Sequence, residues 1–237
     1  QLLPYIDWNI IAKHPKIFSG YSDITALQNA FLAQTGLVSY SGPCFITWSS
    51  PLYKEKSLLS YTLEAFRSAV FEKSDDHLIV KSSSYFEDDN ESGLKAQKGW
   101  WIINGGKASG TIIGGNLSSL GLLQGTAFFP SLKSSILFVE DDYESHADIF
   151  DRDLESLLQV EDAKHIRGLV IGRFEDASKM TKDRLRRIIR SKKQLQGIPV
   201  IANVDFGHTA PLCSFPIGAE ASFTARGTCL KTITIHC

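Results

Sequence analysis

The sequence predicts an α/β protein in which functional side chains collect where strands end. Short apolar runs typical of buried strands alternate with segments that carry apolar residues at helical spacing. Polar motifs directly follow three of the apolar runs. The chain has 237 residues, of which 43% are hydrophobic and 22% charged, an ordinary globular composition. This length suffices for one large domain or two small ones, and no internal repeat is present.

The first part of the chain predicts a strand, a helix and a second strand in close succession. Residues 16–19 contain the apolar pair Ile17-Phe18 and predict the end of a buried strand. Residues 25–32 carry apolar residues, among them Ala and Phe, at helical spacing and predict a helix. Residues 37–40 predict the neighbouring strand. Polar residues and a proline at 47–56 indicate a linker, and 57–71 again have helical periodicity.

A long polar segment, residues 82–99, separates this part from the rest. It combines a serine run, an acidic cluster and two glycines, which predicts an exposed loop that moves as a lid. Trp100 and Trp101 close it. The elements expected beyond it are a strand at 111–113, a Gly-Gly-Asn turn at 114–116, a helix at 117–123, a strand at 135–139, a helix at 148–159, a strand at 167–171, a helix at 181–195, and strands at 198–202, 221–225 and 230–236.

Charge and composition exclude several classes of partner. The net charge is −1 with both signs interspersed, so no basic face predicts binding of a nucleic acid polymer. No apolar run approaches the length of a membrane span, and no signal peptide is recognisable. The histidines lack metal-ligand spacing, and no metal or cofactor is expected. The four cysteines lack a C-x-x-C motif and indicate reduced thiols of a cytoplasmic protein: Cys44, Cys213, Cys229 and Cys237.

Ser22 lies in the motif Gly20-Tyr21-Ser22-Asp23, between the first predicted strand and its helix. A serine on such a sharp turn is presented at a helix N-terminus, where backbone N–H groups stabilise negative charge. The glycine at position 20 gives the turn room. The second glycine of a G-x-S-x-G elbow is replaced by Ile24. An ordinary Ser/Asp helix cap is therefore the alternative interpretation.

Two further polar residues follow strand ends, as Ser22 does. Glu140 comes directly after the strand at 135–139, and His208 follows the strand at 198–202. Serine needs a neutral imidazole to accept its proton, and a carboxylate to hold that imidazole, so the three residue types together predict a hydrolase triad. Individually, Glu140 fits a solvated acidic turn and His208 a loop histidine bonded to backbone.

The chain resembles the LD-carboxypeptidase family of serine peptidases, and within that family it resembles the microcin C immunity branch. The matching stretches span nearly the whole chain in order: LLPYIDW at 2–8, PKIFSGYSDITAL at 15–27, IIGGNLSSL at 112–120, ILFVEDD at 136–142, FDRDLESL at 150–157, GLVIGRF at 168–174 and IPVIANVDFGHTAP at 198–211. The resemblance implies Ser22 as nucleophile, Glu140 as triad acid and His208 as base.

The resemblance also implies the domain layout. Residues 1–50 would be the remnant of an N-terminal Rossmann-like domain, 51–76 a linker and helix, and 77–237 a swivelling, β-rich C-terminal α/β domain. We expect that a preceding segment is missing. The backbone N–H of Asp23 would be one oxyanion donor, and a glycine of the upstream segment the other.

For the substrate, the resemblance implies an aminoacyl-nucleotide or a small peptide. Trp100 or Trp101 would stack on it, Asn116 would contact it, and Glu175 would bind its amino group. The immunity branch carries a lysine shortly after the triad glutamate, whereas this chain has Asp141-Asp142-Tyr143-Glu144, which disfavours a phosphate. The alternatives are a muropeptide substrate, or a non-catalytic binding fragment. Family members form homodimers, and we expect the same here.

Overall fold

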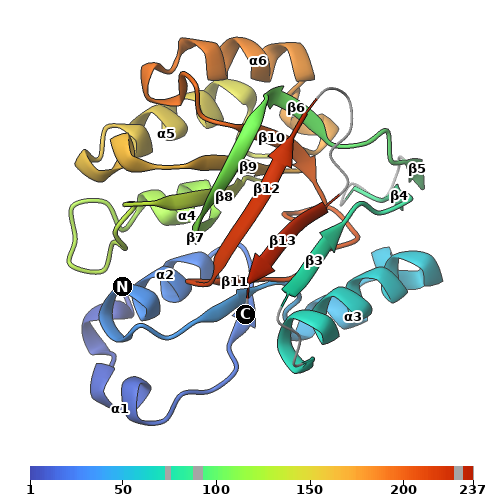
Figure 1. The fold of residues 1–237 in the computed structure, drawn as a ribbon. Coiled ribbons are helices and arrows are strands. Elements are labelled where there is room, and N and C mark those ends of the chain that lie inside the picture. Colours follow the sequence, from blue (N-terminus) through green and yellow to red (C-terminus); the bar gives the residue numbers. More distant parts are fainter. Residues whose placement is uncertain (73–75, 88–92, 227–231, 237) are drawn as a thin grey trace.

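A computed structural model describes residues 1–72, 76–87, 93–226 and 232–236, and an eight-stranded mixed sheet is its centre (Figure 1). The strands of this large sheet lie in the order β3 (Asp76–Val80), β13 (Thr232–His236), β12 (Glu220–Ala225), β7 (Gly106–Asn116), β8 (Ser135–Glu140), β9 (Gly168–Gly172), β10 (Val200–Val204) and β6 (Trp101–Asn104).

Strands β7 to β10 are parallel neighbours, and a helix lies in each connection between them. These helices are α4 (Leu117–Gly121), α5 (Ala147–Leu158) and α6 (Lys182–Ser191). Figure 1 shows α5 and α6 together on one side of the sheet. Since parallel strands end at the same edge, the loops after β8, β9 and β10 converge there. This confirms the α/β class predicted from the sequence.

Alternation along the parallel strands builds two cores. In β8, Leu137 and Val139 belong to the core that contains the α4, α5 and α6 side chains. Ile136 and Phe138 point the other way, into a core that includes Phe215. Successive side chains of a strand face opposite sides, so a fully apolar strand fills both layers.

A smaller three-stranded sheet carries the first part of the chain. Its strands are β1 (Ser19–Gly20), β2 (Ser39–Ser41) and β11 (Phe215–Ile217), and β1 pairs with β2 in parallel. The two strands expected at 16–19 and 37–40 are present as neighbours, but β1 includes only Ser19 of the first range and β2 begins at Ser39. β11 returns from far along the sequence to pair with β2, which the sequence did not reveal.

The remaining helices frame these sheets (Figure 1). α1 (Trp8–Lys13) packs on α2 (Ile24–Thr35), and α3 (Lys56–Phe71) lies beside β3. The segment predicted as a linker instead forms two short 3₁₀ helices, at Phe45–Ser49 and Pro51–Lys54. Further 3₁₀ turns are at Leu3–Tyr5, Glu161–His165, Asp176–Ser178 and Lys193–Leu195. No helix in the described ranges is long and apolar enough to cross a membrane.

Two sequence predictions about β7 are wrong. The strand is not confined to 111–113, because its first half pairs with β12. The expected Gly-Gly-Asn turn at 114–116 is the end of the same strand, since pairing with β8 continues through Asn116 and Glu140. Gly114 is additionally bonded to the Asn29 side chain of α2, with N–O distances of 2.8 and 3.3 Å. These tertiary contacts keep the glycines extended.

The predicted lid is anchored at both ends. β4 (Ser84–Tyr85) and β5 (Lys95–Ala96) form a two-stranded ribbon at its base. Buried Glu87 accepts a bond from Lys95 Nζ at 2.8 Å and one from the Asp176 amide at 3.0 Å. Residues 88–92 of the predicted lid lie outside the described residues. Whether the segment moves stays a prediction.

Candidate active site

Ser22 lies in the turn between β1 and α2, with a φ of 60°. A left-handed backbone at a non-glycine residue is costly and typical of a strained strand-to-helix elbow. A Cβ at Gly20 would lie 2.9 Å from Ile24 Cγ2, so glycine gives this turn room as predicted. The N-cap of α2 is Asp23, not Ser22. The Ser22 hydroxyl is directed to His208 instead of capping the helix.

The structure brings the three predicted triad side chains together. His208 Nε2 lies 3.2 Å from Ser22 Oγ, and His208 Nδ1 lies 2.8 Å from Glu140 Oε2. Glu140 ends β8 and is only 3% exposed, so it is not the solvated turn residue of the alternative interpretation. Gly207, with a φ of 112°, permits this approach, because a Cβ there would lie 2.8 Å from Glu140 Oε2.

Helix α2 is fixed to the end of β7, which aligns Ser22 with the other two residues. Thr25 Oγ1 accepts a bond from the Asn116 backbone N–H at 2.8 Å. The Ser119 hydroxyl donates to Asp23 Oδ1 at 3.3 Å. The first contact joins α2 to the strand end beside Glu140, and the second joins the N-cap of α2 to α4. The alignment of nucleophile and base is therefore built from two sheets.

The environment of His208 determines its protonation. Burial lowers the pKa of His208, but the hydrogen bond and negative charge of Glu140 outweigh burial and raise it to about 9. The charges of Asp142 and Glu175 contribute in the same direction. When the ring is neutral, Nδ1–H donates to Glu140, and Nε2 is left to accept the Ser22 proton. The arrangement is capable of general-base activation of a serine.

Asn116 and the acidic segment after Glu140 make hydrogen bonds that stabilise the local backbone. Asn116 caps α4, its Oδ1 accepting from the Ser119 amide at 3.0 Å, while its Nδ2 donates to Asp141 Oδ1 at 3.2 Å. Burial raises the pKa of Asp141 to about 6, opposing hydrogen bonds from Ser145 and Ser118. The predicted substrate contact of Asn116 stays a prediction. Asp142 caps the following turn, accepting from the Glu144 amide at 2.9 Å.

The two predicted tryptophans lie on opposite sides of the sheet. Trp100 is buried in the core with Phe138, and its Nε1 donates to Asp205 Oδ2 at 2.9 Å. Trp100 is therefore anchored in the core of the protein. Trp101, the next residue, is half-buried against the other core. It lines a cavity of about 300 Å³ together with Phe174 and Met180. Its stacking role stays a prediction.

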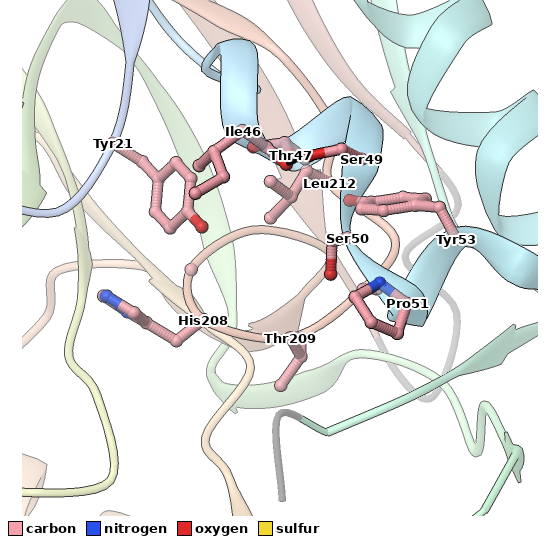
Figure 2. A pocket seen from close by; sticks show the side chains of 12 residues that line it. Tyr21, Ile46, Thr47, Ser49, Ser50, Pro51, Tyr53, His208, Thr209 and Leu212 are labelled. Atoms are coloured by element: carbon pink, nitrogen blue, oxygen red, sulfur yellow. Dashed lines mark hydrogen bonds between the residues drawn. The ribbon is translucent and has the colours of Figure 1, made fainter. Parts of the chain in front are cut away.

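Glu175 and a cavity lie near His208, and the predicted contact of Glu175 with a substrate stays a prediction. Glu175 follows β9 and is 4% exposed. A cavity of about 410 Å³ adjoins His208, whose ring packs edge-on against Tyr21 at 5.4 Å between centroids (Figure 2). Its lining includes hydroxyl side chains that sequence reasoning missed, because the 3₁₀ segment supplying them looked like a linker: Thr47, Ser49, Ser50 and Tyr53.

The structure offers no metal centre within the ranges that it describes. No group of three His, Cys, Asp or Glu side chains there could hold an ion. Cys44 and Cys213 are free thiols. Cys229 and Cys237 lie outside the described residues.

Comparison with known families identifies the family of this chain. The family model for the LD-carboxypeptidase N-terminal domain matches residues 1–42, and that for the LD-carboxypeptidase C-terminal domain matches residues 109–223. The two family models define the class of this protein as a peptidase. The chain belongs to the LD-carboxypeptidase family of serine peptidases, and is a carboxypeptidase-type hydrolase.

Curated relatives span both activities considered from the sequence. YocD of Bacillus subtilis, named as a carboxypeptidase, is 45% identical over 231 residues, which cover 95% of this chain and 69% of YocD. Two relatives are 30% identical. The microcin C7 self-immunity protein MccF of Escherichia coli matches 93% of this chain and 66% of its own length. A Bacillus subtilis protein named as a murein peptide carboxypeptidase matches 98% and 66%.

Solved structures match the fold over the whole chain. An MccF-like protein from Bacillus anthracis superposes with a TM-score of 0.91 at 40% identity, covering 99% of this chain and 72% of that one. MccF in complex with aspartyl sulfamoyl adenosine has a TM-score of 0.82 at 27% identity, covering 100% and 72%. The resemblance to the microcin immunity branch is thereby confirmed.

Proposed function

We propose that this chain hydrolyses an amide bond by a Ser22–His208–Glu140 triad. The observation that carries the proposal is the continuous chain of contacts from Ser22 Oγ through both His208 nitrogens to Glu140, at 3.2 and 2.8 Å. Its members come from three separate elements, and Ser22 adopts a strained backbone. A carboxylate on one ring nitrogen and a serine hydroxyl on the other are the two partners that general-base catalysis by a histidine requires.

The reaction would proceed through an acyl-enzyme. Ser22 Oγ attacks the amide carbon, and its proton passes to His208 Nε2 while Glu140 holds Nδ1–H. The Asp23 N–H would donate to the oxyanion. His208 then protonates the leaving amine as the C–N bond breaks. Water, deprotonated by His208, attacks the ester carbon and releases Ser22.

The favoured substrate is an aminoacyl-sulfamoyl-nucleotide. MccF, a relative of this chain, binds aspartyl sulfamoyl adenosine. Glu175 is the candidate partner for the substrate's amino group. The half-buried Trp101 is the candidate for base stacking, since Trp100 is buried. The carboxylates of Glu140, Asp142 and Glu144 would repel a phosphate, so this acidic segment argues against a phosphate-linked nucleotide.

A muropeptide is the second candidate, because a relative at 30% identity is named as a murein peptide carboxypeptidase. Release assays with aspartyl sulfamoyl adenosine and with an LD-linked muropeptide distinguish the two. We expect cleavage of the sulfamoyl compound, abolished by Ser22→Ala. Cleavage of the muropeptide alone would overturn the substrate, and binding without cleavage of either would favour a non-catalytic module.

We further propose a cytoplasmic homodimer. The proposal rests on the family resemblance, the reduced thiols expected from the cysteine pattern and the net charge of −1, which does not oppose self-association. Light scattering at high concentration should give twice the chain mass. A monomeric mass would count against the dimer, and fractionation of cells tests the compartment.

A further inference from the structure

We propose that Arg173 is a positioning residue for His208, acting through the hydroxyl of Thr209. The proposal rests on the proposed function, because it concerns the base of that triad. Neither Arg173 nor Thr209 belongs to the predicted site residues. Arg173 directly follows β9, and its side chain is only 1% exposed.

Arg173 contacts the segment 205–209 at three points, and His208 lies within that segment. Its backbone N–H donates to the Phe206 carbonyl at 3.1 Å. Its guanidinium pairs with Asp205 through Nη2, and Nη1 donates to Thr209 Oγ1 at 3.1 Å. The first two contacts hold the segment before His208. The third holds Thr209, directly after His208, and the next residue, Ala210, is held by backbone bonds with Phe86 at 2.8 and 2.9 Å.

The segment needs such a hold because its geometry is irregular at Gly207. That residue has a φ of 112° and separates the end of β10 from His208. A rotation about this glycine would swing the imidazole away from Ser22 or from Glu140. Displacements of about 1 Å in a catalytic group cost about a hundredfold in rate. Fixing residues on both sides of His208 limits that rotation.

The charge of Arg173 is already neutralised, which argues for a geometric role. Asp205 is fully buried and also accepts bonds from Trp100 Nε1 at 2.9 Å and from the Ser82 amide at 3.3 Å. The guanidinium lies 4.4 Å from the centre of the Tyr85 ring. A neutral, enclosed pair is poorly suited to bind a substrate anion. Buried ion pairs are also weak sources of stability, whereas they do fix geometry.

The test uses labelling of Ser22 by a fluorophosphonate, which does not depend on the natural substrate. Ser22 Oγ attacks phosphorus, fluoride leaves, and the serine proton passes to His208. Thr209→Val removes the acceptor of the Arg173 bond at nearly constant volume, and Thr209→Ser is the matched control that keeps it. Thr209→Ala deletes the same hydroxyl with less bulk, in case the valine variant does not fold. Thermal unfolding of every variant accompanies the kinetics.

We expect the maximal labelling rate of Thr209→Val to fall by about tenfold or more, with unchanged half-saturation by the probe. Thr209→Ser should label at nearly the wild-type rate. The positioning role would be overturned if Thr209→Val or Thr209→Ala were labelled at the same rate as the wild-type protein. It would also be overturned if Thr209→Ser lost as much labelling rate as Thr209→Val. A wild-type protein that is not labelled at all would instead contradict the proposed triad.

Discussion

At the residue scale, the site depends on how Glu140 alters His208. A base whose pKa is about 9 is mostly protonated at neutral pH, and only its neutral form accepts the Ser22 proton. The turnover rate should therefore rise with pH by about tenfold per unit below the pKa, and level off above it. The rise follows from Glu140, since burial alone would lower the pKa.

The variant Glu140→Gln separates these two influences. Removing the carboxylate removes the main cause of the raised pKa, so the rising limb of the pH–rate profile should move to lower pH. Maximal turnover should fall by about 10³- to 10⁴-fold, because the tautomer and orientation of His208 are no longer fixed. A complete pH–rate profile of both proteins measures this. An unchanged inflection would show that Glu140 does not control the base.

At the element scale, the loop after β10 sets the distance between His208 and Glu140. In Gly207→Ala, the new Cβ would lie 2.8 Å from Glu140 Oε2, at a φ that alanine rarely adopts. Turnover should fall by about a hundredfold or more while circular dichroism stays native. Gly36→Ala is the control, since it also has a positive φ but no atom within 4 Å of the added methyl group. Equal activity losses in both variants would contradict the local explanation.

Substitutions of the adjacent residues Trp100 and Trp101, just before and at the start of β6, should have different effects. Trp100→Ala should lower stability by about 3–5 kcal/mol, because it empties a buried site and removes a donor to Asp205. Trp101→Ala should leave stability nearly intact and weaken binding of an aromatic-bearing substrate, by about 1–3 kcal/mol. Thermal melts and ligand titrations check both. Unchanged affinity in Trp101→Ala would remove its stacking role.

At the scale of the whole molecule, the triad depends on contacts that are distant in sequence. His208 and Ser22 are 186 residues apart, and His208 and Glu140 are 68 apart. The proximity of Glu140 and His208 was predictable, because each follows a parallel strand of the large sheet and such strands end at one edge. Ser22 follows a strand of the smaller sheet, so the sequence pattern alone did not predict how it meets them. The pairing of β11 with β2 was not predictable, because an apolar run of three residues does not indicate which strand it pairs with.

The other features that the sequence did not predict depend on tertiary packing between distant parts of the chain. The two adjacent tryptophans read as equivalent, whereas strand alternation sends one into each core. The Gly-Gly-Asn run has the composition of a turn, and only its pairing with β8 and its bonds to α2 keep it extended. Arg173 and Asp205 look like ordinary surface charges in the sequence. Their mutual burial is a property of the folded chain.

The central claim is that Ser22 is the nucleophile, and the location of a covalent adduct tests it most directly. The protein is treated with a fluorophosphonate, digested, and the modified peptide is sequenced by tandem mass spectrometry. We predict a single phosphonyl group on Ser22, absent from Ser22→Ala and strongly reduced in His208→Ala. An adduct on another serine, or undiminished labelling of the Ser22→Ala variant, would contradict the account.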